Sequence, residues 1–387
     1  MIRLRTVRFP RSNEGPVGIV GGGNSAHALA AYLAQRGYAP HLFVRTPRKI
    51  AAVATTKLLR ATGAIDGLFA VPMVTSSMEE LLSICPTVFV CTVATAYRDV
   101  ARQMAPYLTS AHEIIVFSSK LFGSLELARA IDAHGGAQPD LIAETDALFA
   151  ARLQDDGSVH VRGIKKWNLA ATPAAEDMER GVALLQRFFP QVERAANLVQ
   201  RGLTDFGALV HPLTVLVNAN RVDRGESFLF YMDGFTPRTA ALIEALEAEF
   251  RSIAGAYGSS LISARDLLDR YYGCDTSGTL LHAMRTVPNY QTSIAPTKLD
   301  HRYLREDVTC TLLPAHQLAK KAMLDVPVLD SVVSLARVLL GPELFAGCRN
   351  LASLGWGALS ASEINERLHV SRPRHRAPEQ QRYERVS

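Results

Sequence analysis

The feature that most constrains the fold of this chain is a glycine-rich segment near its N-terminus, residues 16–38 (PVGIVGGGNSAHALAAYLAQRGY). A short apolar run ends at Val20, three glycines follow, and an alanine-rich stretch of helical character comes next. Strand, tight turn and helix in this order form the first unit of a parallel α/β sheet. We therefore predict that the folded part of the chain begins with such a sheet.

The spacing of the glycines predicts a dinucleotide site. Gly21, Gly23 and Ala26 satisfy the pattern G-x-G-x-x-G/A. The first glycine permits a sharp turn, the second leaves room for a pyrophosphate, and the alanine lets the helix pack closely on the sheet. Free N–H groups at the helix N-terminus favour an anion. A turn that binds nothing is the alternative, but its place between strand and helix favours a Rossmann site. The predicted contacts are Gly21, Gly22, Gly23, Asn24, Ser25 and Ala26.

The end of the second predicted strand, residues 40–45, indicates which dinucleotide is bound. Proteins that bind NAD carry an acidic residue here, about 20 residues beyond the glycines, for the ribose hydroxyls. This chain instead has Arg45, Thr46 and Arg48. A guanidinium can grip a ribose 2′-phosphate, which a carboxylate would repel. We predict NADP as the cofactor, with NADPH preferred over NADH; a solvated cationic turn is the alternative.

Further along the chain, strand-like runs at 87–93 and 113–119 alternate with helical stretches, which predicts a parallel sheet covered on both faces. From about Leu203 long helical stretches such as 236–258 take over. The predicted class is therefore α/β plus all-α. The predicted parts are a flexible basic extension (1–15), a Rossmann NADP-binding domain (16–200), a helical substrate and catalytic domain (201–368) and a flexible basic tail (369–387).

Composition narrows the class of protein. The chain is 48% hydrophobic and 20% charged, as expected of a globular protein with a large core. Its five scattered cysteines have neither zinc-site spacing nor the density of a disulfide framework, so we expect a reducing cytoplasm and no metal site. No apolar stretch could span a membrane, and the +5 charge gathers at the two ends. Small-molecule substrates are expected as partners, without nucleic acid or membrane, and a homodimer stays open.

Polar residues at the ends of the predicted strands are further candidates, because ligands of such sheets lie beyond the carboxyl ends of the strands. Thr92 ends the run at 87–93 and is a candidate cofactor contact. Ser118 and Thr145 are candidate substrate contacts. Ordinary strand ends look much the same, which is the alternative.

Two clusters in the second half carry unusual chemistry. In one, His211 and Asn218 interrupt an apolar helical region; in the other, Arg302, Glu306 and Asp307 lie within a few residues of one another. A lone histidine in an apolar setting is more often a core residue than a catalyst, and a charged cluster is often a solvated turn. The sequence does not show that the clusters meet.

Several segments resemble the octopine, nopaline and related opine dehydrogenases. The HP(x5)N pattern at 211–218, FLFYMDGFTP at 228–237 and HRYLREDV at 301–308 resemble their helical domain. GGGNSAHALAAYLAQRG and GIKKWNLAA are similar to their Rossmann domain. The resemblance runs in one order from about Val17 to Leu359.

Enzymes of that family join the amino group of an amino acid to the carbonyl carbon of a 2-oxo acid, commonly pyruvate. They reduce the imine with a nicotinamide cofactor, which yields a secondary amine dicarboxylate. The resemblance implies that His211 is the catalytic histidine, Asp307 the carboxylate associated with it, and Arg302 the arginine of the substrate site, with Asn218 as a further substrate contact.

The chain departs from the family pattern at two places. Thr204 and Asp205 stand where many members have a Ser-Asn pair, and Arg45 and Thr46 replace the acid expected for NAD. The first departure lies close to the histidine in the sequence, so the resemblance leaves the amino acid substrate open.

Two other functions fit the same layout. One is an NADP-dependent dehydrogenase of a 2-hydroxy acid or polyol phosphate, which would need no amine. The other is a non-catalytic NADP-binding protein, in which the histidine, arginine and aspartate merely pack. An opine enzyme that builds a metal chelator from a larger amine is a narrower variant of the family reading.

Overall fold

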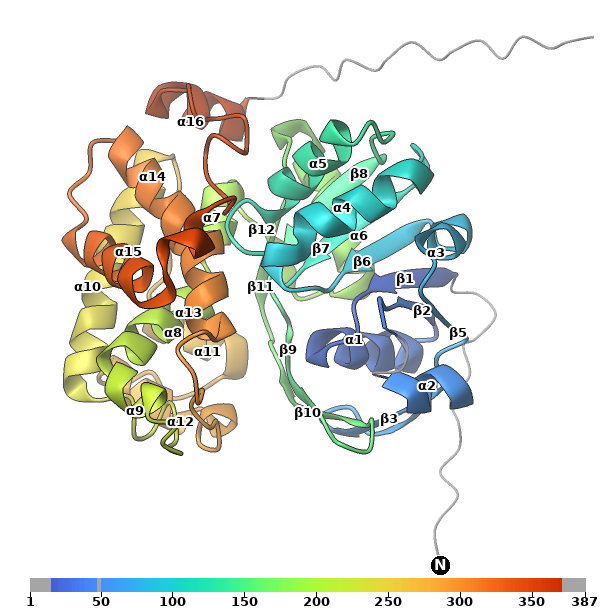
Figure 1. Ribbon diagram of the computed structural model, residues 1–387, viewed down its shortest axis with the longest axis horizontal. Coiled ribbons are helices and arrows are strands. Elements are labelled where there is room, and N and C mark those ends of the chain that lie inside the picture. Colours follow the sequence, from blue (N-terminus) through green and yellow to red (C-terminus); the bar gives the residue numbers. More distant parts are fainter. Residues whose placement is uncertain (1–14, 47–49, 371–387) are drawn as a thin grey trace, which may run out of the picture.

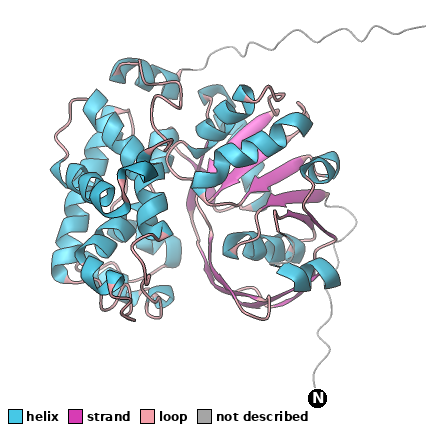
Figure 2. Cartoon of the chain, viewed as in Figure 1, coloured by secondary structure: helices cyan, strands magenta, loops and turns pink. Residues whose placement is uncertain are grey.

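The computed structural model describes residues 15–46 and 50–370 (Figure 1). Arg48, the predicted N-terminal extension up to residue 14 and the predicted tail from residue 371 lie outside this range. Two domains lie side by side, an α/β domain followed by a domain of helices (Figure 2). The predicted class, α/β plus all-α, is confirmed.

The α/β domain is built on an eight-stranded sheet. Its strands are β1 (Pro16–Val20), β2 (Ala39–Phe43), β5 (Met73–Thr75), β6 (Thr87–Val90), β7 (Glu113–Phe117), β8 (Leu141–Thr145), β11 (Asn168–Ala171) and β12 (Val192–Arg194). They lie in the order β12-β11-β8-β7-β6-β1-β2-β5. All neighbours are parallel except β11 and β8. The prediction of a parallel sheet holds for six strands, and β11 and β12 run in the opposite direction.

Helices cover both faces of this sheet, as the continuous apolar character of its strands predicts. Ile115 and Phe117 of β7 point to one face, Ile114 and Val116 to the other, and all four are buried. The first face packs against α1 (Asn24–Gln35) and α6 (Met178–Phe188). The second packs against α3 (Met78–Ile84), α4 (Tyr97–Met104) and α5 (Gly123–Ala133).

A second, four-stranded sheet was not predicted from the sequence. Its strands are β4 (Gly67–Ala70), β3 (Leu58–Gly63), β10 (Val159–Ile164) and β9 (Phe149–Leu153), in that order, with α2 (Ala51–Thr56) before β3. Phe149, Val159 and Val161 join the core beneath α1. In Figure 1, β9 and β10 run along the side of the α/β domain that faces the helices.

The second domain consists of helices around one large core. They are α7 (Leu198–Leu203), α8 (Phe206–Val217), α9 (Ala219–Asp223), α10 (Pro237–Ala256), α11 (Ala264–Tyr272), α12 (Leu280–Thr286), α13 (Arg302–Asp307), α14 (Leu313–Lys321), α15 (Pro327–Leu340) and α16 (Ala361–His369). A π-helical segment, 308–312, joins α13 to α14. The change of architecture falls between Arg194 and Leu198, slightly before residue 201.

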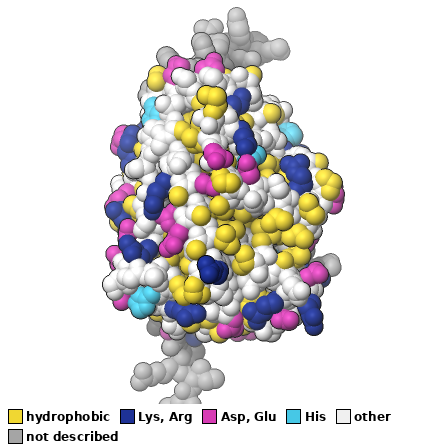
Figure 3. Space-filling model, turned by 90° about the vertical axis from the view of Figure 1, so that its left-hand side faces the viewer, with side chains coloured by type: hydrophobic (Ala, Val, Ile, Leu, Met, Phe, Trp, Pro, Cys, Tyr) yellow, Lys and Arg dark blue, Asp and Glu magenta, His cyan; other side chains and the backbone are white. Residues whose placement is uncertain are grey.

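The outer face of the helical domain mixes charged and hydrophobic side chains (Figure 3). Leu335, Val338 and Leu339 of α15 are among the exposed hydrophobic residues. Each helix within the described ranges is too short or too polar to cross a membrane. In the same ranges, no three His, Cys, Asp or Glu side chains converge as metal ligands would.

Candidate active site

A cavity of about 420 Å³ opens at the carboxyl ends of β1, β2 and β6. β1 pairs with β2 on one side and β6 on the other, so the chain leaves the sheet in two directions here. Such a switch point is where open α/β sheets bind ligands. Of the predicted site residues, the cavity is lined by Gly21, Gly22, Gly23, Asn24, Ser25, Arg45, Thr46, Thr92, Ser118 and Arg302.

The glycines fit a dinucleotide for reasons that the coordinates make explicit. Gly21 has a φ of +146°, and a Cβ there would lie 2.6 Å from the carbonyl oxygen of Cys91. A Cβ at Gly22 would lie 2.8 Å from Val44 Cγ1. A Cβ at Gly23 would meet no atom within 4 Å, so the space beside this residue is open for a phosphate. Ala26 is fully buried under the sheet.

The cavity also offers polar groups. Thr92 Oγ1 and Ser118 Oγ are buried and have no hydrogen-bond partner among the described residues, although both line the cavity. Asn24 Oδ1 accepts a bond of 2.9 Å from the Leu153 N–H, so its side chain also ties β9 to the glycine turn. Arg45 is 75% exposed, with Nη1 3.8 Å from Asp99 Oδ2 across the cavity mouth.

The structure brings His211 and Asp307 together, although 96 residues separate them. His211 on α8 has Nδ1 2.8 Å from Asp307 Oδ2 at the end of α13. Its Nε2 lies 2.9 Å from the Tyr231 hydroxyl. The ring of Tyr303 stacks on the imidazole at 3.9 Å with an angle of 15° between planes. The histidine is thus oriented by three groups, unlike a passive core histidine.

A buried lysine completes this constellation. Lys120 Nζ lies 2.7 Å from Asp205 Oδ2 and 2.6 Å from Asp307 Oδ1. The three side chains are only 8%, 2% and 3% exposed. Burial alone would raise the pKa of Asp307, but Lys120 and the hydrogen bond from His211 outweigh burial and hold that pKa below its usual range. Asp307 is therefore a carboxylate at neutral pH.

The turn after β7 delivers Lys120 to this position. Ser118 adopts a φ of +67°, a conformation that non-glycine residues rarely hold without support from their surroundings. Arg201 of α7 supplies that support, with bonds of 3.0 Å to the Ser119 carbonyl and 2.8 Å to the Lys120 carbonyl. Its guanidinium is itself paired with Glu144 on β8 at 2.5 Å. The lysine is held by contacts from both domains.

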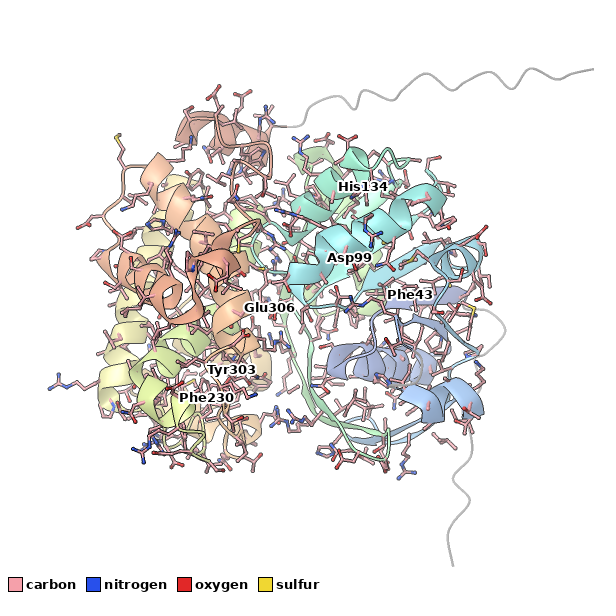
Figure 4. The ribbon with its side chains drawn as sticks, in the orientation of Figure 1. Phe43, Asp99, His134, Phe230, Tyr303 and Glu306 are labelled. Carbon is pink, nitrogen blue, oxygen red and sulfur yellow. The ribbon has the colours of Figure 1, made fainter. Side chains whose placement is uncertain are left out.

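Arg302 connects the cavity to the histidine site. It is 54% exposed, lines the cavity, and has Nη2 3.0 Å from Glu306 Oε2. Glu306 Oε1 accepts a bond of 2.7 Å from the Ala94 N–H, next to the strand end that carries Thr92. Figure 4 shows Tyr303 and Glu306 on the helical side, near the α/β domain. His211 does not line the cavity itself, so Arg302 is the predicted catalytic residue that does.

Two predicted substrate contacts are engaged elsewhere. Asn218 ends α8, and its Nδ2 donates to the Thr214 and Gly234 carbonyls at 2.9 and 2.8 Å. Thr145 is fully buried, and its hydroxyl donates to the Leu169 carbonyl at 2.9 Å. Neither side chain lines the cavity. Both instead satisfy backbone carbonyl groups that would otherwise lack a hydrogen-bond partner.

Other residues of the site escaped prediction. Nothing in the pattern around Lys120 distinguishes it from an exposed lysine after a strand, although Ser118 was noted two residues earlier. Tyr231 lies in the segment 228–237, where no local pattern marks a tyrosine as a site residue. Asp205 was noted as a departure from the family, and its proximity to Lys120 is a tertiary contact that local sequence does not report.

Two known protein families match the chain, one over each domain. Residues 194–340 match the NAD/NADP octopine/nopaline dehydrogenase α-helical domain. Residues 17–174 match the ketopantoate reductase PanE/ApbA family. The two matches correspond to the helical and α/β domains.

Whole-chain relatives agree with this division. The opine dehydrogenase of Arthrobacter sp. (strain 1C) is 28% identical over 350 residues, or 89% of this chain and 96% of the relative. An octopine dehydrogenase structure with NADH and L-arginine superposes with a TM-score of 0.71 at 18% identity, over 94% of this chain and all of that one. A yersinopine dehydrogenase with NADP⁺ bound gives 0.67 at 16% identity, over 93% and 99%.

Proposed function

This chain belongs to the opine dehydrogenase family, and we propose that it condenses the amine of an amino acid with a 2-oxo acid and reduces the imine to a secondary amine dicarboxylate. A bound nicotinamide cofactor supplies the hydride. The observation that carries the proposal is the bond between His211 and the buried carboxylate of Asp307, on a helix that also carries Arg302 into the lining of a dinucleotide cavity.

The tautomer of His211 follows from its partner at Nδ1. Because Asp307 is ionised it can only accept, so Nδ1 carries the hydrogen of the 2.8 Å bond. Nε2 of the neutral ring is then a free acceptor, to which the Tyr231 hydroxyl donates. An incoming ammonium takes the place of this hydroxyl and gives its proton to Nε2. The carboxylate of Asp307 stabilises the imidazolium that forms.

The same proton serves the second half of the condensation. The freed amine attacks the carbonyl carbon of the oxo acid, and one of its N–H protons passes to the alkoxide to give the carbinolamine. His211 then returns the first proton to the carbinolamine hydroxyl, which leaves as water, and a protonated imine remains. The guanidinium of Arg302 binds the carboxylate of the oxo acid through paired N–H bonds and turns the imine carbon toward the cavity. This chain's residues thus supply orientation and proton transfer.

We further propose that NADPH is preferred over NADH. Arg45 and Thr46 line the cavity at the end of β2, where an acidic residue would serve NAD. The largely exposed guanidinium of Arg45 is free to turn toward a 2′-phosphate. The proposed location is the cytoplasm, since all five cysteines are free thiols. The homodimer stays a prediction.

Oxidation of NADPH, followed at 340 nm over a grid of amino acids and 2-oxo acids, tests the proposed function. We expect turnover only when amine and oxo acid are both present, and a secondary amine dicarboxylate by mass spectrometry. The match of residues 17–174 to ketopantoate reductases favours one second candidate, reduction of an oxo acid alone. Turnover that is undiminished when the amine is omitted would establish that second function instead.

A further inference from the structure

Two arginines, Arg152 and Arg162, lie on the strands of the small sheet that border the helical domain. We propose that Arg152 and Arg162 form a second carboxylate subsite, and that the amine substrate is an amino acid bound there through its carboxylate. The inference rests on the proposed condensation, whose product carries two carboxylates. Arg302 accounts for one of them, and the other needs a cationic partner.

Both arginines are directed to the same side of the small sheet. Arg152 lies directly opposite His160, and Val161 lies opposite Ala151. Val161 is buried in the core under α1, while Arg152 and Arg162 are exposed. Side chains alternate along a strand, so Arg152, which lies opposite His160, points away from α1. Arg162 is the extra residue of a β-bulge, and its bonds to Asn289 and Ser293 place its guanidinium on the side of the helical domain. In Figure 1, that side of β9 and β10 is turned toward the helical domain.

Direct contacts show that this face reaches the helical domain. Arg162 Nη1 donates to the Asn289 carbonyl at 3.2 Å and to Ser293 Oγ at 3.3 Å. Beside it, a Cβ on Gly163 would lie 2.5 Å from Asn289 Nδ2, so the side chain of Asn289 lies against the backbone of β10. The guanidinium of Arg162 is therefore held at the boundary between the domains.

The electrostatic effect of both arginines reaches the groups around His211. Burial raises the pKa of Tyr303, the ring that stacks on the histidine, and Arg152 and Arg162 oppose that rise. Burial also raises the pKa of Tyr231, which Arg162 again opposes. Both positive charges thus act on Tyr303, and that of Arg162 also acts on Tyr231.

Arg152 and Arg162 have no carboxylate partner among the described residues, whereas three other cations at the boundary do. Lys120 is shared by Asp205 and Asp307, Lys165 lies 2.6 Å from Asp146, and Arg302 pairs with Glu306. No carboxylate of the described residues lies within 4.0 Å of the guanidinium nitrogens of Arg152 or Arg162. A fixed excess of positive charge attracts a carboxylate and repels a cation.

The excess of positive charge at Arg152 and Arg162 determines which class of amine the site accepts as a substrate. An amino acid with a neutral or acidic side chain presents its carboxylate to the two arginines while its nitrogen faces His211. A decarboxylated amine lacks the group that the subsite binds. An amino acid with a basic side chain brings a second positive charge into a cationic wall, so both kinds of amine are poor substrates.

Calorimetric titration of the cofactor-bound protein tests the subsite without turnover. The probes are iminodiacetate, a secondary amine with two carboxylates, and N-methylglycine, which has one. In the wild-type protein iminodiacetate should bind about 10- to 100-fold more tightly, as one charge-assisted hydrogen bond or a pair would give. In Arg152→Gln and Arg162→Gln this advantage should fall to a few-fold. Arg60→Gln, on β3 of the same sheet, should keep it.

Steady-state kinetics separate the subsite from the function itself. In Arg152→Gln and Arg162→Gln the KM for the amino acid should rise at least about tenfold, with the KM for the oxo acid nearly unchanged. Good turnover with decarboxylated or basic amines would overturn the subsite and leave the condensation standing. If no amine supports turnover, the proposed function fails, and the iminodiacetate titration still decides whether the two arginines bind a second carboxylate.

Discussion

At the scale of single residues, the chemistry depends on how His211 is held. Asp307 orients Nδ1, Tyr231 contacts Nε2, and Tyr303 covers one ring face. None of these partners lines the glycine turn, so the binding of cofactor and the transfer of protons involve separate groups.

Replacing His211 with alanine should therefore affect turnover alone. We expect kcat to fall by two to four orders of magnitude, about the range for a general acid or base, while the Kd for NADPH stays within about two-fold. Stopped-flow turnover and fluorescence titration of NADPH measure the two quantities. Near-normal kcat in a folded His211→Ala protein would remove the histidine from the mechanism.

Lys120 should act on the same step through Asp307. In Lys120→Met two buried carboxylates lose their shared cation, and one of them takes up a proton near neutral pH. We expect kcat to fall at least about tenfold, and the acid limb of the pH profile to move to higher pH. Adding Asp205→Asn, which keeps an N-cap on α8, should restore part of the rate. A structural role alone would leave the pH profile in place.

The lowered pKa of Asp307 predicts how the stability of the fold depends on pH. The pKa of Asp307 is lower in the folded than in the unfolded protein, so its ionisation stabilises the fold above the unfolded pKa of about 4. This contribution is lost as the pH falls through the lower, folded pKa. The difference in unfolding free energy between wild type and Asp307→Asn should thus shrink below about pH 4, as urea titrations at several pH values would show; a constant difference would contradict it.

Cofactor preference is also decided by one residue in our proposal. Arg45→Asp should weaken NADPH binding about 10- to 100-fold, because it replaces the guanidinium by a group that repels the 2′-phosphate. NADH binding should change little. Parallel titrations with both cofactors measure this, and equal effects on the two would contradict the assignment.

At the scale of elements, the glycine turn between β1 and α1 supports a matched pair of substitutions. Gly21→Ala should destabilise the fold by about 1–3 kcal/mol, since its φ is +146° and the new Cβ would meet the Cys91 carbonyl. The new Cβ of Gly23→Ala would meet no protein atom, so the free energy of unfolding should stay unchanged while the affinity for the cofactor falls. Thermal unfolding without cofactor and NADPH titration distinguish the two; an equally stable Gly21→Ala protein would argue against strain.

Elements also show what local sequence can predict. The glycine turn, β1, β6, β7 and α10 follow from apolar runs, turn residues and helical periodicity, and their bounds differ from prediction by only a few residues. The four-stranded sheet does not follow from local sequence because β3 pairs with β10, which lies far along the chain. The contacts of Lys120 were missed for the same reason, since they join residues 85 or more apart in the chain.

At the scale of the whole molecule, buried ion pairs fasten the helical domain to the sheet domain. Arg349, which follows α15, is fully buried and has Nη2 2.7 Å from Glu126 on α5. It also donates to the Leu121 carbonyl at 2.8 Å and the Cys310 carbonyl at 3.2 Å. The same guanidinium thus binds backbone from both domains, close to the turn that carries Lys120.

Removal of this guanidinium should destabilise both domains together. Arg349→Met leaves the buried Glu126 carboxylate with only the partly exposed Arg98 as a cation partner, so we expect a loss of up to about 3–5 kcal/mol, the cost of breaking a buried pair. The double variant Arg349→Met with Glu126→Gln should recover part of the loss, because no buried carboxylate remains and Arg98 is partly exposed to solvent. Arg129→Met, an exposed residue of the same helix, should change stability by less than about 0.5 kcal/mol. Urea unfolding followed by tryptophan fluorescence and circular dichroism measures these differences. A double variant less stable than Arg349→Met would show that the pair holds the domains by its shape and hydrogen bonds rather than by its charge.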